Sequence, residues 1–184
     1  MDRKNSERIA AEQPREKRRE KPLEERVVEL LAGQGLTVTT AESCTGGLIA
    51  GTLVNVAGAS DVLNEGYVTY SNEAKERLVG VRHETLKAYG AVSQQTAREM
   101  AEGAAKAAGA DAALSATGIA GPGGGTREKP VGLVYIGCFL RGKTEVKECR
   151  FDGSRMENRM HTVETALGML KTRLEAEASE AVSP

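Results

Sequence analysis

The sequence predicts a three-layer α/β/α domain with a mixed β-sheet that ends in a hairpin. Segments with apolar residues at helical spacing alternate along the chain with short runs rich in β-branched and small apolar residues. Near the C-terminus two apolar runs, 131–140 and 144–151, are joined by the short turn 141–143, which is typical of a hairpin. Hydrophobic residues make up 40% and charged residues 28% of the chain, the balance of a globular protein.

The helices and strands are expected in a definite order. The first helix starts at residue 23 after a proline and is closed by Gly33 and Gly35. Ser93 is a good N-cap for the long Ala-rich helix, and Gly109 marks its end. After the first helix, the expected elements are strand 36–41, helix 48–56, strand 67–70, helix 72–78, a helical turn at 85–89, helix 94–108, strand 112–117, the two hairpin strands and a closing helix 154–177.

A length of 184 residues suits one domain with a proper core and is short for two. Residues 1–22 carry many charges of both signs and two prolines, so we expect a disordered N-terminal extension there. The domain is expected over 23–177, and residues 178–184 are expected to form a flexible tail.

Composition excludes several classes of function. The net charge of −1 gives no steering toward nucleic acid, and only 3% of the residues are aromatic, which disfavours base stacking. Three widely spaced cysteines without a CxxC pair, together with two histidines, argue against a zinc site and a disulfide framework. No apolar run is long enough for a membrane span or an export signal. We therefore expect a cytoplasmic protein without a metal ion.

Two segments have the character of a ligand site. Residues 40–47 join an expected strand to a helix, and residues 117–125 form a glycine-dense loop after a buried strand. Ligands of open α/β sheets gather at the carboxyl ends of strands, and small residues allow backbone N–H groups to approach an anion there. The first segment also directs a helix N-terminus at such an anion. The glycine loop fits neither a P-loop nor a dinucleotide fingerprint, so it is either a mobile surface loop or a phosphate-binding loop.

Ser43, in the first segment, has two interpretations. A serine at a strand-to-helix junction is usually an N-cap, but the adjacent glycines leave space for a substrate, which would suit a nucleophile. Cys44 is a rival nucleophile, since a helix N-terminus lowers the pKa of a thiol, and it is alternatively a small buried packing residue. The residues alone leave both questions open.

A serine nucleophile needs a base, and neither histidine is an obvious one. His83 lies in a polar stretch and His161 lies inside the closing helix. Tyr70 at a strand end and Lys75 five positions later could converge on one site. A lysine acts as a base only where desolvation or nearby cations lower its pKa; otherwise Lys75 is a solvated helix lysine.

Residues 24–175 resemble the CinA C-terminal family in four motifs. In order they are TTAESCTGG at 39–47, YVTYSNEAK at 67–75, GAVS at 90–93, and TGIAGP at 117–122 followed by KPVG at 129–132. Four motifs in register are far more specific than any one of them. Many family members also carry a large N-terminal domain with a pyrophosphatase-type activity; residues 1–22 are too short for it, so that activity is expected to be absent.

The resemblance implies a nicotinamide-nucleotide amidohydrolase. Nicotinamide mononucleotide and water would give nicotinic acid mononucleotide and ammonia, without metal or cofactor, in pyridine nucleotide (NAD) recycling. Ser43 would be the nucleophile and Lys75 the base, with Tyr70 beside them. The amides of residues 44–47 would hold the oxyanion. The residues expected to bind the substrate are Cys44, Thr45, Gly46, Gly47, Thr117, Gly118, Gly121, and Arg155 or Arg159.

One alternative function stays open at this stage. The domain could be a non-catalytic nucleotide-binding or competence-associated interaction domain that uses the glycine loop only to bind phosphate. The expected partners are the small nucleotide substrate and a second copy of the chain, because Ala/Gly-rich helices with few aromatics can pack against their own kind. Contact with nucleic acid is expected only through the basic residues of 1–22, if at all.

Overall fold

The computed structural model describes residues 21–182. The expected extension at 1–22 therefore lies almost wholly outside the described residues, as do residues 183 and 184. The elements are α1 (Leu23–Gln34), β1 (Val38–Glu42), α2 (Leu48–Leu53), η1 (Ala59–Asp61), β2 (Tyr67–Val68), α3 (Asn72–Val79), α4 (His83–Tyr89), α5 (Gln94–Ala108), β3 (Ala112–Gly118), β4 (Leu133–Leu140), β5 (Lys143–Arg150) and α6 (Arg155–Val182).

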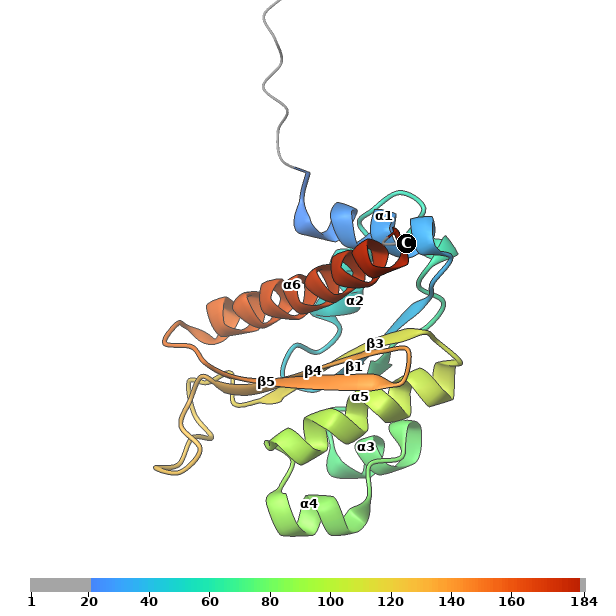
Figure 1. Cartoon of the computed structure of the whole chain (residues 1–184). Coiled ribbons are helices and arrows are strands. Elements are labelled where there is room, and N and C mark those ends of the chain that lie inside the picture. Colours follow the sequence, from blue (N-terminus) through green and yellow to red (C-terminus); the bar gives the residue numbers. More distant parts are fainter. Residues whose placement is uncertain (1–20, 183–184) are drawn as a thin grey trace, which may run out of the picture.

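The strands form one mixed sheet in the order β2-β1-β3-β4-β5. Strand β1 pairs in parallel with β2 and β3, whereas β3, β4 and β5 pair antiparallel with one another. Helices α1, α2 and α6 cover one face of the sheet, and α3, α4 and α5 cover the other (Figure 1). The three-layer α/β/α class with a C-terminal hairpin is therefore confirmed.

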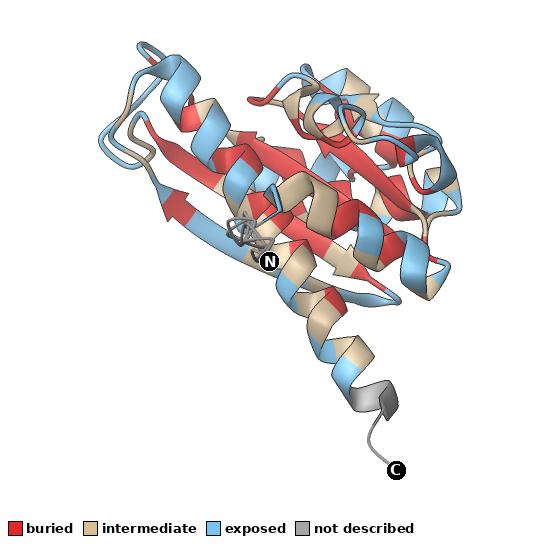
Figure 2. Ribbon diagram, turned by 90° about the horizontal axis from the view of Figure 1, so that it is seen from above, coloured by how far each residue is buried: buried red, intermediate tan, exposed pale blue. Residues whose placement is uncertain are grey.

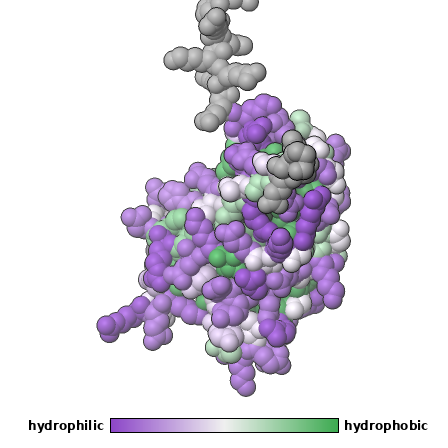
Figure 3. All heavy atoms as spheres, viewed as in Figure 1, coloured by the Kyte–Doolittle hydropathy of each residue, from purple (hydrophilic) through white to green (hydrophobic). Residues whose placement is uncertain are grey.

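Each face of the sheet has its own apolar core. On one face, Leu31 and Leu170 of the helices pack with Ile136 of the sheet. On the other face, Val79 and Met100 belong to a second buried cluster. The central strands are buried between the layers, and β5 at the edge is mostly exposed (Figure 2). The surface seen in Figure 3 is mainly hydrophilic, with small apolar patches.

Local signals in the sequence explain several element ends. The Ser93 side chain accepts the N–H of Thr96 and caps α5, and Gly109 ends that helix with a left-handed φ of 61°. The hairpin turn has two residues, Arg141 and Gly142, whose positive φ angles of 45° and 83° match the twist of the flanking strands. The predicted cap, helix end and hairpin are confirmed.

Several boundaries differ from expectation, including the start of strand β4 at Leu133 rather than at 131, and three of the differences have a clear local cause. Helix α2 ends at Leu53 rather than at 56, because the β-branched residues and the asparagine that follow it continue only in tight turns. Strand β2 stops at Val68 rather than at 70, because β1 offers no partner beyond Glu42. Helix α6 continues past 177 to Val182, so the first residues of the expected flexible tail are helical; most of them are alanine or glutamate, and none is glycine or proline.

Cys44, Cys138 and Cys149 are free thiols and buried. None of the helices within residues 21–182 combines the length and the hydrophobicity that crossing a bilayer requires.

Candidate active site

The loop of residues 43–47 joins β1 to α2 and is fixed by a buried carboxylate. Glu42, at the end of β1, has no exposed surface. Its Oε2 accepts the N–H groups of Gly47 and Ile49 at 2.9 and 3.0 Å, and its Oε1 accepts that of Ala50 at 2.9 Å. The last residue of the strand therefore caps the helix that follows it.

This cap corrects one expectation from the sequence. The N-terminus of α2 was expected to face an anionic ligand, but the negative charge of Glu42 already occupies it. Ser43 is not the cap of α2 either, since its backbone N–H donates to Ala116 O at 2.9 Å and it lies ahead of the helix. The capping interpretation of Ser43 is therefore wrong, and its hydroxyl is available for other contacts.

Lys75 lies against Ser43. It projects from α3 and is only 1% exposed. Its Nζ lies 3.2 Å from Ser43 Oγ and donates to the backbone carbonyl of Thr69 at 2.7 Å. Within residues 21–182, Lys75 forms no ion pair with a carboxylate. The interpretation of Lys75 as a solvated helix lysine is wrong.

The surroundings of Lys75 favour its neutral form. Burial lowers the pKa of Lys75 below its ordinary value, although the charge of Glu73, and that of Cys44 when its thiol is ionised, oppose that shift. An ammonium group has three N–H donors. Among the described residues, Lys75 Nζ has two hydrogen-bond partners, Ser43 Oγ and Thr69 O. A neutral amine can donate to Thr69 O and accept the Ser43 hydroxyl proton, which is the geometry of a nucleophile and its base.

Cys44 is not activated by the same surroundings. Burial raises the pKa of its thiol to about 11, and the backbone N–H groups of Cys44 and Thr45 oppose the shift only in part. The nearby charge of Glu42 raises the pKa further. A thiol with this pKa is almost wholly protonated at neutral pH and is a poor nucleophile. The buried packing interpretation of Cys44 fits these surroundings.

A cavity of about 220 Å³ opens beside Ser43 and Lys75. The predicted site residues that line it come from four separate parts of the chain. They are Ser43, Cys44, Tyr70, Lys75, Thr117, Gly118 and Arg155. Thr45, Gly46, Gly47, Gly121 and Arg159 were also predicted and do not line it.

Tyr70 and Arg155 lie together at the mouth of this cavity. Tyr70 is 65% exposed, and its hydroxyl accepts Arg155 Nη2 at 3.3 Å. Arg155 Nη1 donates to Gly121 O at 2.9 Å. Both side chains therefore border the opening, and the Tyr70 hydroxyl is directed to Arg155 rather than to the Ser43–Lys75 pair among the described residues.

Arg159 has a different position from Arg155. It is half-buried, and its Nε donates to Cys44 O at 3.1 Å while its Nη2 donates to Thr45 O at 2.7 Å. Both bonds go to the backbone of the loop 43–47. The first turn of α6 thus places one arginine at the cavity mouth and the next one, a helical turn later, against the loop.

Packing accounts for several glycines of the loop 118–125. A Cβ at Gly118 would lie 2.7 Å from Leu133 O, and one at Gly121 would lie 2.6 Å from the Val131 side chain. A Cβ at Gly125 would lie 2.7 Å from Val131 N. The loop needs these glycines to pack against the segment before β4, so their presence is no evidence for phosphate binding.

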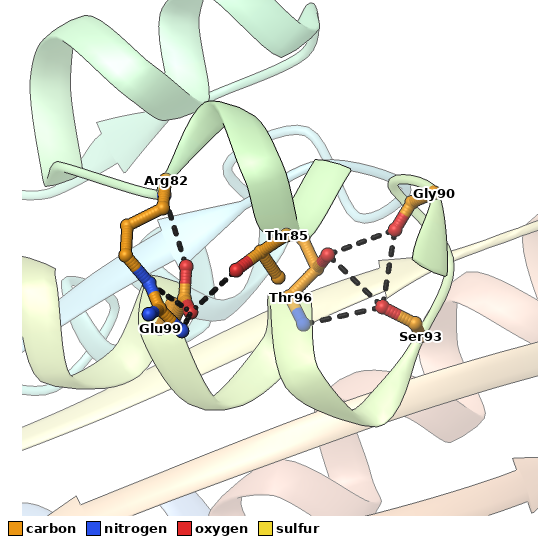
Figure 4. Close-up of polar contacts among 6 residues, drawn as sticks. All are labelled: Arg82, Thr85, Gly90, Ser93, Thr96 and Glu99. Atoms are coloured by element: carbon orange, nitrogen blue, oxygen red, sulfur yellow. Dashed lines mark hydrogen bonds and ion pairs between the residues drawn. The ribbon is translucent and has the colours of Figure 1, made fainter. Parts of the chain in front are cut away.

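A polar network fixes the part of the cavity wall that is formed by Ala91 and Val92, which were not among the predicted site residues. Ser93 and Thr96 both donate to the carbonyl of Gly90, as Figure 4 shows. This holds the turn before α5, where Ala91 and Val92 line the cavity. Thr117 donates to Ala91 O at 2.7 Å from the opposite side.

A second group of bonds in Figure 4 fixes α4 on α5. Arg82 donates its backbone N–H at 2.9 Å and its guanidinium to Glu99, and Thr85 Oγ1 donates to the same carboxylate at 2.7 Å. Burial tends to raise the pKa of Glu99, but these bonds outweigh burial and the pKa lies below its ordinary value.

Sequence reasoning missed three kinds of contributor. Glu42 was quoted in a motif but given no role, although an acidic residue shortly before a helix start is a recognisable cap signal. The Thr69 carbonyl accepts a hydrogen bond from Lys75, and the buried Asn158 donates to Ala120 O at 3.1 Å. Both contacts involve backbone atoms, which residue types in a motif do not reveal. Within residues 21–182, no group of three histidine, cysteine or acidic side chains could hold a metal ion.

Comparison with known proteins agrees with this architecture. The chain is 56% identical over 155 residues to a CinA-like protein of Kosmotoga olearia, an alignment that covers 84% of this chain and 38% of that protein. The crystal structure of the competence/damage inducible protein CihA from Agrobacterium tumefaciens superposes with a TM-score of 0.80 at 51% identity, covering 83% of this chain and 93% of that one.

A CinA superfamily protein from Klebsiella pneumoniae superposes with a TM-score of 0.81 at 38% identity, covering 84% of this chain and 96% of that one. The chain thus spans well under half of the Kosmotoga relative and nearly the whole of both solved structures. A family described as the CinA C-terminal domain matches residues 20–174, and the chain belongs to that family.

Proposed function

We propose that this domain hydrolyses the carboxamide of nicotinamide mononucleotide to the carboxylate, releasing ammonia. The observation that carries the proposal is the Ser43–Lys75 pair: a buried lysine with a lowered pKa, 3.2 Å from a serine hydroxyl that borders a cavity. The choice of this substrate rests on the family resemblance of the motifs around both residues.

The reaction would proceed through an acyl-enzyme. Ser43 Oγ attacks the carboxamide carbon while Lys75 Nζ takes the hydroxyl proton. Lys75 then returns a proton to the departing nitrogen, and ammonia leaves. A water molecule, deprotonated by Lys75, attacks the ester, the carbon–Oγ bond breaks, and Ser43 recovers its proton as the acid product leaves.

Two backbone amides are suited to the oxyanion of each tetrahedral intermediate. The expectation from the sequence included residues 44–47, but Gly46 N–H donates to Ser43 O and Gly47 N–H donates to Glu42. The N–H groups of Cys44 and Thr45 remain, and an oxyanion donor contributes about 3–4 kcal/mol to transition-state stabilisation.

The size of the cavity supports a substrate that enters with one end. At about 220 Å³ it is smaller than the roughly 300 Å³ at which pockets for whole ligands begin. The pyridine ring and its carboxamide would fill it, and the ribose and phosphate would extend toward Tyr70 and Arg155. Because the Thr117 hydroxyl proton is used by Ala91, its oxygen would accept an N–H of the carboxamide. The pyridinium charge would further favour a neutral Lys75.

Ammonia release from nicotinamide mononucleotide tests the proposal. We expect steady release by the wild-type protein, no release by Ser43→Ala, and a loss of at least about a hundredfold in kcat for Lys75→Ala, since general base catalysis contributes about 10²–10⁴-fold. Cys44→Ala is the matched control, because it shortens the side chain next to Ser43 but keeps Ser43, Lys75 and the backbone amides; its ammonia release should stay close to that of wild type.

Two outcomes would contradict the proposal. Activity that survives Ser43→Ala and is lost in Cys44→Ala would move the nucleophile by one residue. Binding of the nucleotide without ammonia release would favour a non-catalytic nucleotide-binding domain instead.

A further inference from the structure

Arg159 makes an unusual pair of contacts for a residue so near the cavity. Its guanidinium bridges two successive backbone carbonyls, Cys44 O and Thr45 O, through Nε at 3.1 Å and Nη2 at 2.7 Å. Arg159 Nη2 also lies 3.5 Å from the position that a Cβ on Gly46 would occupy, so the side chain lies directly against the loop. The guanidinium of Arg159 therefore holds the loop at two consecutive peptide groups.

Fixing a carbonyl also fixes an N–H. In a planar trans peptide the C=O and N–H point in opposite directions. The bond from Arg159 to Cys44 O therefore sets the Thr45 N–H, which points away from Arg159. The bond from Arg159 to Thr45 O likewise sets the Gly46 N–H, and the bond from Gly46 N–H to Ser43 O at 3.1 Å in turn sets the Cys44 N–H.

These two amides are the ones in the loop that donate neither to a backbone carbonyl nor to a carboxylate. In the described structure, the Ser43, Gly46 and Gly47 amides donate to Ala116 O, Ser43 O and the Glu42 carboxylate. Among residues 21–182, the Cys44 and Thr45 amides face only the Cys44 thiol, which is a weak acceptor. Both lie close to the Cys44 side chain, which lines the cavity beside Ser43.

We propose that Arg159 is a positioning residue that orients the Cys44 and Thr45 amides toward the oxyanion, rather than a ligand of the substrate phosphate. The proposal rests on the proposed amide hydrolysis for the identity of the oxyanion. Arg155 is the arginine that meets the substrate, because it is exposed and lines the cavity mouth. The two arginines that the sequence offers for one position of the family pattern, Arg155 first and Arg159 next, thus have different tasks.

A comparison of two substrates separates the two roles of an arginine. Arg159→Ala is assayed with nicotinamide mononucleotide and with nicotinamide riboside, which lacks the phosphate. Misaligned oxyanion donors should lower kcat by about 10–100-fold on both substrates, with little change in KM. A phosphate ligand would instead raise KM for the mononucleotide and leave the riboside unaffected, which would overturn the proposal.

Arg173→Ala is the matched control. Arg173 also lies on α6 and also donates to two backbone carbonyls, those of Cys138 and Lys143, away from the cavity. Both substitutions remove the same kind of hydrogen bond, so both should reduce thermal stability, but Arg173→Ala should keep its kcat. Ethylguanidine added to Arg159→Ala should restore part of kcat. An equal loss of kcat in both variants would show a general structural effect and contradict the proposal.

A fluorophosphonate probe tests the inference independently of the substrate. Ser43 Oγ attacks phosphorus, the P–O bond forms, fluoride leaves and Lys75 takes the proton, while the phosphonyl oxygen needs the same two amides. Labelling of Ser43, followed by mass spectrometry, should be about tenfold or more slower in Arg159→Ala than in wild type.

The labelling result separates two failures. Wild-type protein that labels at Ser43 but releases no ammonia would overturn the proposed substrate, and slower labelling of Arg159→Ala would still support the positioning role. Equal labelling rates, or a wild-type Ser43 that does not label, would overturn the positioning role.

Discussion

Lys75 is the residue on which the proposed chemistry of the site depends. A lysine side chain that is 1% exposed, with only a carbonyl and a hydroxyl as partners among the described residues, is costly when charged. Burial therefore lowers the pKa of Lys75, which favours the neutral amine. The same burial that suits Lys75 to the proposed role of a base therefore lowers the stability of the fold whenever Lys75 is protonated.

Lys75→Met should reveal this effect as a pH dependence of stability. Between the lowered pKa of folded Lys75 and the unfolded value of about 10.4, the unfolded chain binds a proton that the native state lacks. The free energy of unfolding of wild type should therefore rise with pH in this window relative to Lys75→Met, by up to about 1.4 kcal/mol per pH unit. Urea unfolding at several alkaline pH values measures the difference.

The control for this experiment is Lys106→Met. Lys106 is exposed on α5, so its side chain is in water in both states and its variant should differ from wild type by a constant amount. The packing that Lys75→Met removes does not depend on pH, so its effect cancels from the slope. A flat difference for Lys75→Met would mean that the native state keeps Lys75 charged.

At the scale of elements, the loop 43–47 is fixed from both sides by ions. The Glu42 carboxylate holds the amides at the start of α2, and the Arg159 guanidinium holds two carbonyls of the loop. Neither is exposed enough to be an ordinary surface charge. Together they set where Ser43 and the Cys44 and Thr45 amides point.

Helix α3, which carries Lys75, is set by a close approach to α5. A Cβ on Gly103 of α5 would lie 1.6 Å from Val79 O at the end of α3, so the two helices touch through the backbone. Gly103→Ala would force them apart and should reduce the free energy of unfolding by about 3 kcal/mol. Chemical denaturation measures the loss.

Gly168→Ala is the matched control, because Gly168 also lies inside a long helix, α6, and has no atom within 4 Å of its Cβ position. That variant should gain up to about 1 kcal/mol through helix propensity. Similar effects of both substitutions would argue against a backbone contact between α3 and α5.

At the scale of the molecule, sheet topology assembles the site. Strands β1 and β3 are parallel neighbours, so the loops that follow them, 43–47 and 118–125, leave the sheet at the same end. Figure 1 shows the start of α6 at that end too. Residues as far apart in sequence as Ser43 and Arg155 meet at one cavity for this reason.

Removal of residues 1–20 should leave deamidation unchanged. The family match begins at residue 20, and the residues that line the cavity lie between Ser43 and Arg155. We expect the same kcat and KM for nicotinamide mononucleotide as in the full chain. A rise in KM would mean that basic residues of the removed segment contact the substrate.

Much of this arrangement was predictable from the sequence because its signals are local. The spacing of apolar residues, the Ser93 cap and the glycine of the hairpin turn each affect only residues nearby in the sequence. These signals predicted the elements and the fold class. Ser43 and Lys75 were found through their motifs. Without those motifs, the residue types favoured a helix cap for Ser43 and a solvated lysine for Lys75.

The tertiary structure alone decided which atoms the site residues contact. Arg155 and Arg159 are both arginines of one helix turn, and only the packing of α6 sends one to the cavity and the other to the loop backbone. The protonation state of Lys75 depends on its burial, which is a property of the whole fold. Sequence determines which groups are present; distances across the fold determine which of them meet, because a hydrogen bond or a pKa shift depends on separation in space and not along the chain.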